Sequence, residues 1–331
     1  MPPSTRHLLR TLATVLLLAC GATAARAGEP PRVVASILPL HALAAAVMEG
    51  VGRPHLLVPP GASPHTFQLK PSEAKKLQEA DLVLWVGETL ETFLEKPLRT
   101  LPKRARVVAV GELPGVETLP PRSGGVWGEH GHDHGHGQGH RHKHGKAPAG
   151  VGEHDRGIDG HLWLDPMNGK AIVLGLAEVL AGRDPERAER YRANAAREAA
   201  RIEALHAELE ARLSPVASRP FVVFHDAYQY FERRYGLSAA GSITVSPERP
   251  PSAKRLAALR KTIRERGAVC VFAEPQFKAP IVASLAEGTG ARTSVLDPVG
   301  APPIEPGPGA YRALLDKLGR DLATCLAGPT G

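Results

Sequence analysis

The strongest constraint on the fold of this chain is an alternation of short β-rich runs with helix-length stretches, and the same alternation is found in each half of the chain. In the first half we predict strands at 32–36, 55–58, 81–86 and 106–110, and helices at 41–50, 72–80 and 90–100, with Ser72 capping the second helix. In the second half we predict strands at 221–225, 239–245, 268–273 and 293–296, and helices at 227–235, 252–266, 280–290 and 311–326. Because strands that alternate with helices form βαβ units, we expect an α/β fold of two lobes with mostly parallel sheets.

A charge-rich helical run at 184–213 separates the two alternating halves. Asp184 can cap this helix and Pro185 suits its first turn. At 1.5 Å per residue the run is about 45 Å long, enough to reach across two lobes as a rigid spine. We therefore predict an N-terminal lobe at 28–183, a linking helix at 184–213 and a C-terminal lobe at 214–331; a helical hairpin within one lobe is the alternative.

Histidine is the unusual entry in the composition, with 15 residues in a 331-residue chain. Eight of them lie in one Gly-rich stretch without an apolar period, which predicts a mobile surface loop at about 120–160. These are His130, His132, His134, His136, His140, His142, His144 and His154. Neutral imidazoles on a loop can chelate Zn²⁺ weakly, so we interpret the loop as an auxiliary zinc collector or sensor, with a merely solvating loop as the alternative.

The charge pattern argues against a nucleic-acid partner. The 41 Lys and Arg residues exceed the 34 Asp and Glu residues, but they form no long basic block and are not interleaved with aromatic residues. A hydrophobic content of 43% also excludes a wholly disordered chain.

The first 27 residues predict export. Arg6 and Arg10 precede an uncharged run at 11–25, and Ala-Arg-Ala at 25–27 is typical of a signal-peptide cleavage site. The run is too short to span a membrane of about 30 Å. We therefore expect a soluble periplasmic protein; the alternatives are a lipoprotein anchored at Cys20 and a short N-terminal core helix. In an oxidising compartment Cys270 and Cys325 are favoured to pair, although two free thiols are possible.

Four further residues lie at the ends of predicted strands or in the loops that follow: His65, His161, His225 and Asp297. In parallel α/β sheets ligands bind where the carboxyl ends of strands meet. Three imidazoles and one carboxylate suit Zn²⁺ in a four-coordinate site. Their spacing does not by itself show that they converge, and each His taken alone fits a surface or satisfied core position better than a ligand position.

Six motifs give the chain a specific resemblance. They read Gly-Ala-Ser-Pro-His-Thr-Phe at 61–67 followed by Leu-Lys-Pro-Ser at 69–72, Ala-Asp-Leu-Val-Leu-Trp-Val-Gly at 80–87, His-Leu-Trp-Leu-Asp-Pro at 161–166, Phe-His-Asp-Ala-Tyr-Gln-Tyr-Phe at 224–231, Cys-Val-Phe-Ala-Glu-Pro-Gln-Phe at 270–277, and Leu-Asp-Pro-Val-Gly at 296–300. From about Val33 to Leu326 the chain resembles the zinc-specific substrate-binding proteins of bacterial ABC transporters, a branch of the cluster A-I (cluster 9) metal-binding family.

The resemblance implies a zinc site in a cleft between two lobes joined by a rigid helix, with a His-rich loop at its mouth. Carried over by motif, His65, His161 and His225 are the imidazole ligands and Asp297 is the candidate fourth ligand. The family's disulfide falls on Cys270 and Cys325. The implied function is zinc capture and delivery to an inner-membrane ABC permease, without enzymatic activity, and we expect a monomer.

Two departures from the family pattern limit this transfer. Some zinc members have a Glu ligand immediately before the first His, where this chain has Pro64, so the fourth ligand is Asp297, a water, or both in exchange. Some members bind a second zinc through a His in a Leu-Gly-His segment, which here reads Ala-Gly-Ser at 240–242.

Two other functions stay open from sequence. Manganese members have Glu where this chain has His225, and imidazole in that place shifts preference toward Zn²⁺. A manganese-binding or adhesin-type relative is therefore the first alternative. A zinc-dependent hydrolase is the second, but four protein ligands without an open position suit holding an ion better than activating a water.

Overall fold

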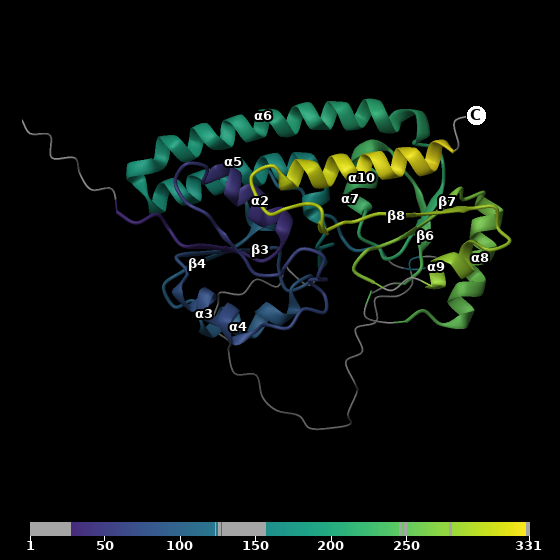
Figure 1. Cartoon of the computed structure of the whole chain (residues 1–331), viewed down its shortest axis with the longest axis horizontal. Coiled ribbons are helices and arrows are strands. Elements are labelled where there is room, and N and C mark those ends of the chain that lie inside the picture. The colour runs from purple at the N-terminus through teal and green to yellow at the C-terminus, as the bar shows by residue number, and fades with distance from the viewer. Residues whose placement is uncertain are drawn as a thin grey trace, which may run out of the picture. The chain divides into compact units, whose positions relative to one another are not determined.

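The computed structural model describes residues 28–122, 124, 127, 157–244, 247, 250–277 and 280–328. The chain divides into two compact units, Met1–Pro30 and Pro31–Gly331. Residues 28–30 of the first unit form no helix or strand, and every element below belongs to the second (Figure 1). The predicted signal peptide at 1–27, with Cys20, lies outside the described residues.

The first sheet is parallel, with the strand order β2-β1-β3-β4. Its strands are β1 (Val33–Ala35), β2 (His55–Leu56), β3 (Leu82–Trp85) and β4 (Arg106–Ala109). Alternate residues point to opposite faces, and both faces are buried, as parallel sheets require. Val34 and Val83 share one core with the helix α3 (Pro71–Glu79), whereas Ala35 and Leu84 face a second core that includes α2 (Leu38–Val47).

The second sheet repeats this topology with the parallel order β6-β5-β7-β8. Its strands are β5 (Phe221–Val223), β6 (Ala239–Ser242), β7 (Cys270–Ala273) and β8 (Arg292–Val295). Val222 and Val271 pack with the helices α8 (Ala253–Arg266) and α9 (Pro280–Ala286). Phe221 and Phe272 face the other way, into the core that the first sheet also uses.

A helical layer covers this shared core. It contains α5 (Pro166–Arg183), α6 (Ala188–Leu213) and α10 (Ala310–Ala327). The helix α7 (Gln229–Tyr235), which lies between β5 and β6 in sequence, also contacts α6. Figure 1 shows α6 and α10 side by side along one side of both sheets. With 26 residues, α6 is about 39 Å long. Two parallel-sheet α/β lobes and a long helix confirm the predicted fold class.

The structure corrects several predicted local features. The long helix begins at Ala188 rather than at 184, because the Asp184 carboxylate accepts hydrogen bonds from Arg187 and Tyr191 and a 3-10 turn, η6 (Pro185–Arg187), comes first. Ser72 does not cap α3, which begins at Pro71 after Lys70. The segment predicted as one helix at 90–100 is a 3-10 turn, η1 (Thr92–Leu94), followed by α4 (Glu95–Thr100).

Helix α5 was not predicted, because it lacks the amphipathic period that identifies a surface helix. Close packing requires small residues on it. A Cβ on Gly169 would lie 2.2 Å from the Tyr311 hydroxyl, and one on Gly175 would lie 3.3 Å from Leu113. Helices α5 and α6 pack against each other. The predicted boundaries at 183 and 213, which separate an N-terminal lobe, a linking helix and a C-terminal lobe, stay a prediction.

Two further observations concern the cysteines and the apolar length of the helices. Cys270 in β7 and Cys325 in α10 form a disulfide, as predicted. No described helix is both long and apolar enough to cross a membrane.

A buried carboxyl group joins the carboxyl ends of β1 and β3. Glu91 is fully buried and accepts hydrogen bonds from the Ser36 hydroxyl, from Val86 N at 3.1 Å and from Gly87 N at 3.0 Å. Burial outweighs these bonds and raises the pKa of Glu91 from 4.5 to about 7.

This raised pKa predicts a pH-dependent stability. Between pH 4.5 and about 7 the native protein holds a proton on Glu91 that the unfolded chain has lost, so the free energy of unfolding falls as the pH rises. In Glu91→Gln this contribution is absent. From pH 5 to pH 7.5 we expect the variant to gain up to about 3 kcal/mol relative to the wild type, measured by urea unfolding. Glu95→Gln, at a half-buried position on α4, is the control, and parallel pH profiles for wild type and Glu91→Gln would contradict the prediction.

Candidate metal centre

Three of the predicted ligands converge. His65 lies in the loop after β2, His161 directly precedes the 3-10 turn η5 (Leu162–Leu164), and His225 lies in the loop after β5. One ring nitrogen from each lies within 4.8 Å of the other two, and the Nε2 atoms of His161 and His225 are 3.2 Å apart. His161 and His225 are buried. The structure therefore brings together three side chains that the spacing alone could not place.

The sheet topology explains part of this convergence. In the order β6-β5-β7-β8 the strand that follows β5 in sequence lies on one side of it, and β7 lies on the other side. The strand order therefore reverses between β5 and β7, and the carboxyl ends of such a strand pair form a crevice. His225 follows β5 and Glu274 follows β7, so the two side chains meet at this switch point. The His225 Nδ1 atom lies 2.8 and 2.7 Å from the two carboxylate oxygens of Glu274.

Carboxylates orient two of the three rings. His225 Nδ1 donates to Glu274, and His161 Nδ1 donates to Asp159 Oδ1 at 2.8 Å. These bonds leave the Nε2 atom of each ring facing the centre, and a carboxylate behind an imidazole also makes it a stronger ligand. Asp159 and Glu274 were not identified from sequence. The available signal was the position of Asp159 two residues before His161 and that of Glu274 at the end of a buried strand.

The electrostatics of the three rings differ. Burial, together with the neighbouring His225 and His161, holds the pKa of His65 well below its ordinary value. Burial also acts to lower the pKa of His225, but the charge of Glu274, with smaller contributions from Asp226 and Asp159, outweighs it and raises that pKa. His65 is thus a neutral ring at neutral pH, whereas His225 holds a proton more readily than a free imidazole.

The contact between His161 and His225 has a chemical consequence. Their Nε2 atoms are at hydrogen-bond distance, and both Nδ1 atoms donate outward to carboxylates. The Nε2 lone pairs of the two rings therefore face each other. A divalent cation that binds both Nε2 atoms satisfies both lone pairs at once.

The fourth predicted ligand lies outside this group of three. Asp297 follows β8, and its Oδ1 accepts from Gln276 Nε2 at 2.7 Å, Val299 N at 3.1 Å and Gly300 N at 2.9 Å. Its Oδ2 accepts from Ala301 N, which leaves a lone pair on that oxygen. Coordination by Asp297 stays a prediction. The eight histidines of the predicted auxiliary loop, from His130 to His154, lie outside the described residues.

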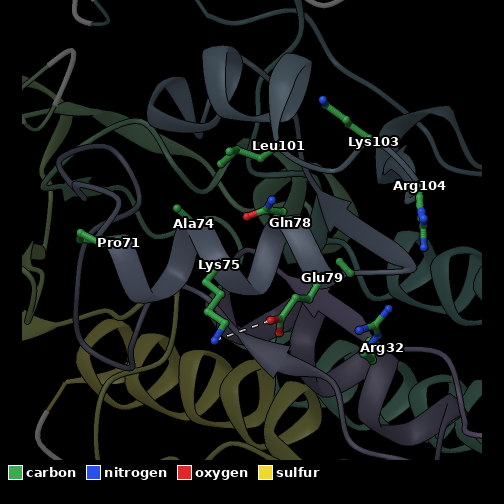
Figure 2. A pocket seen from close by; sticks show the side chains of 10 residues that line it. Arg32, Pro71, Ala74, Lys75, Gln78, Glu79, Leu101, Lys103 and Arg104 are labelled. Carbon is green, nitrogen blue, oxygen red and sulfur yellow. Dashed lines mark ion pairs between the residues drawn. The ribbon is translucent and has the colours of Figure 1, made fainter.

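A pocket of about 810 Å³ lies elsewhere, at the amino-terminal edge of the first sheet. Figure 2 shows four cationic side chains around it, from Arg32, Lys75, Lys103 and Arg104. Its one carboxylate, Glu79, pairs with Lys75 at 3.8 Å. With no imidazole or thiol among its lining residues, this pocket does not suit a borderline-soft metal ion.

Two parallel α/β lobes, with a polar centre at the carboxyl ends of their strands, define the class of two-lobed solute-binding proteins. The profile of the family described as "Zinc-uptake complex component A periplasmic" (ZnuA) matches residues 33–325. The chain belongs to this family.

Individual relatives agree with this membership. A protein of Brucella suis named "High-affinity zinc uptake system protein ZnuA" is 45% identical over 332 residues, which cover 97% of this chain and 98% of the relative. A protein of the same name from Yersinia pestis is 37% identical and covers 95% and 96%. The solved structure "Crystal structure of ZnuA" superposes with a TM-score of 0.69 at 26% identity, covering 88% of this chain and 99% of that one.

The geometry predicts the tautomers of the metal-free protein. Because Glu274 and Asp159 accept from Nδ1, we expect the Nδ1 atoms of His225 and His161 to carry protons at neutral pH. Long-range ¹H–¹⁵N correlation spectra with selectively labelled histidine measure this directly. In Glu274→Ala the preference should be lost for His225 and kept for His161, and an unprotonated Nδ1 on both rings of the wild type would contradict the interpretation.

Proposed function

We propose that the chain is a periplasmic zinc-binding protein that captures Zn²⁺ through His65, His161 and His225 and delivers it to an ABC permease of the inner membrane. The observation that carries this proposal is the convergence of three imidazole nitrogens within 4.8 Å. The relatives support the cargo and the transport role, because they are named as zinc uptake proteins and align over nearly the full length of the chain. The family description and the predicted signal peptide support the periplasm.

The donor set favours zinc on chemical grounds. Imidazole suits Zn²⁺ better than the harder Mn²⁺, which prefers oxygen. The charge behind the rings also favours a cation, because Asp159 and Glu274 are buried. The Asp159 Oδ2 atom is buried without a hydrogen-bond partner among the described residues. Removing this oxygen from water costs free energy, and a bound cation nearby would offset that cost.

The fourth position is assigned to Asp297 or to a water molecule. Pro64 stands where some zinc members have Glu, so the residue next to His65 offers no side-chain ligand. The free lone pair of Asp297 Oδ2 suits a metal–oxygen bond, provided that this oxygen moves toward the three rings. Such a site holds its ion in a closed shell, which fits a transport role rather than catalysis.

Single substitutions test the ligand set. His65→Ala, His161→Ala and His225→Ala each remove one of three nitrogen donors, and we expect zinc affinity to fall by at least about 100-fold, since losing a mere supporting partner already costs 10- to 100-fold. Competition against a fluorescent zinc chelator measures this. His206→Ala is the matched control, because His206 lies on α6, contacts the Tyr235 hydroxyl at 3.2 Å and is outside the group of three.

The same assay on Asp297→Asn separates the two candidates for the fourth position. If the carboxylate binds zinc, affinity falls as far as in the His variants; if a water completes the shell, it falls far less. Wild-type affinity in all three His variants would refute the proposed site.

The predicted auxiliary loop has its own test. The three imidazoles and their carboxylate partners all lie outside residues 128–154, and Leu119 and Asp159 bond to each other on either side of that segment, with Asp159 N donating to Leu119 O at 2.7 Å. Deleting residues 128–154 should therefore leave one tight zinc equivalent and remove only the weaker ones. Isothermal titration with zinc counts both kinds. Loss of the tight equivalent would show that the loop is part of the main site.

A further inference from the structure

The segment from Leu119 to Arg122, at the start of the predicted His-rich loop, is bonded to the surroundings of His161. Asp159 N donates to Leu119 O, and Leu119 N donates to the Tyr230 hydroxyl at 2.8 Å. The same hydroxyl donates to Asp159 O at 2.9 Å. Leu119 thus fixes the backbone of Asp159, whose side chain orients His161, and Tyr230 ties both to α7 of the second lobe.

Three residues further along, the same segment reaches the surroundings of His225. The Arg122 Nε atom donates to both carboxylate oxygens of Asp226, at 3.0 and 3.1 Å, and its Nη1 and Nη2 atoms donate to Glu232, each at 2.9 Å. The Asp226 and Glu232 side chains are only 6% and 7% exposed. One face of the guanidinium lies 3.6 Å from the centroid of Trp127. These contacts fix the guanidinium in position and direction.

Asp226 is the residue that follows His225. One short segment therefore holds the carboxylate partner of His161 at Leu119 and the neighbour of His225 at Arg122. The two imidazoles that it connects face each other at 3.2 Å. Asp226 is the only acidic residue directly next to His65, His161 or His225 in sequence.

We propose that Arg122 is a positioning residue for the metal centre, which fixes the spacing of His161 and His225 by binding Asp226 from the segment that also holds Asp159. This inference rests on the zinc site proposed above. Without Arg122 the His225 loop keeps its bonds to Glu274 but loses those to the segment that holds Asp159, so it shifts more readily relative to His161. The bound ion should then dissociate faster, and its coordination geometry should become less regular.

The first experiment compares Arg122→Met with the wild type in the full chain. We expect zinc dissociation, measured by stopped flow against excess chelator, to be about 10- to 100-fold faster. With Co²⁺ in place of Zn²⁺, the visible absorption of the tetrahedral ion should lose intensity. Arg312→Met is the control: it removes a guanidinium that lies 2.9 Å from the buried carboxylate of Glu198, between α10 and α6, while Arg201 stays 3.5 Å from that carboxylate. It should lower the melting temperature and leave both metal signals unchanged.

A triple variant separates positioning from charge compensation. Arg122→Met with Asp226→Asn and Glu232→Gln removes the cation together with the two charges it neutralises. We expect this variant to recover the melting temperature of the wild type but to keep the fast zinc dissociation. Recovery of slow dissociation and of the Co²⁺ spectrum would overturn the proposal, as would wild-type kinetics in Arg122→Met. If the wild type bound no zinc at all, the proposed function would have failed instead.

Discussion

The hydrophobic core that both sheets share determines where the three imidazoles lie. Residues on one face of β1 and β3 and residues on one face of β5 and β7 belong to the same continuous cluster, together with side chains of α2, α5, α6 and α10. Direct bonds cross this core: the Trp163 indole donates to Pro298 O at 2.8 Å, and the Tyr311 hydroxyl donates to Trp163 O at 2.8 Å. Trp163 follows His161 by two residues and Pro298 follows Asp297, so packing in the core fixes these two parts of the site relative to each other.

The overall architecture of this protein could be predicted from the sequence, but several local details could not. The alternation of strands and helices identified both sheets, because period and length are local properties. Helix α5 was missed since its neighbours bury it on several sides, and its glycines are required by Tyr311 and Leu113, which are distant in sequence. The start of α6 was misplaced by four residues because Asp184 bonds to Arg187 and Tyr191 and so stabilises a 3-10 turn.

The site shows the same division between local and distant information. His65, His161 and His225 were identified through motifs, and their convergence depends on contacts between segments that no spacing rule describes. Asp159 and Glu274 were overlooked although both lie within or beside those motifs, because a carboxylate that orients a ring looks like any other acidic residue in a sequence. Only the Nδ1 contacts at 2.8 and 2.7 Å reveal their role.

The charge around the centre argues for a divalent ion over a proton. Asp226 and Glu232 share the cation of Arg122, and Asp297 is stabilised by backbone amides and Gln276. Among the described residues Asp159 and Glu274 form ion pairs only with the imidazoles, while Glu274 also accepts from the Tyr228 hydroxyl at 3.2 Å. This leaves two buried carboxylates behind two rings. One proton added to this pair of rings would balance only one of these charges. A divalent cation on the two Nε2 atoms balances both and needs no further charged residue, and it also allows His65, whose pKa is low, to bind as a neutral ligand.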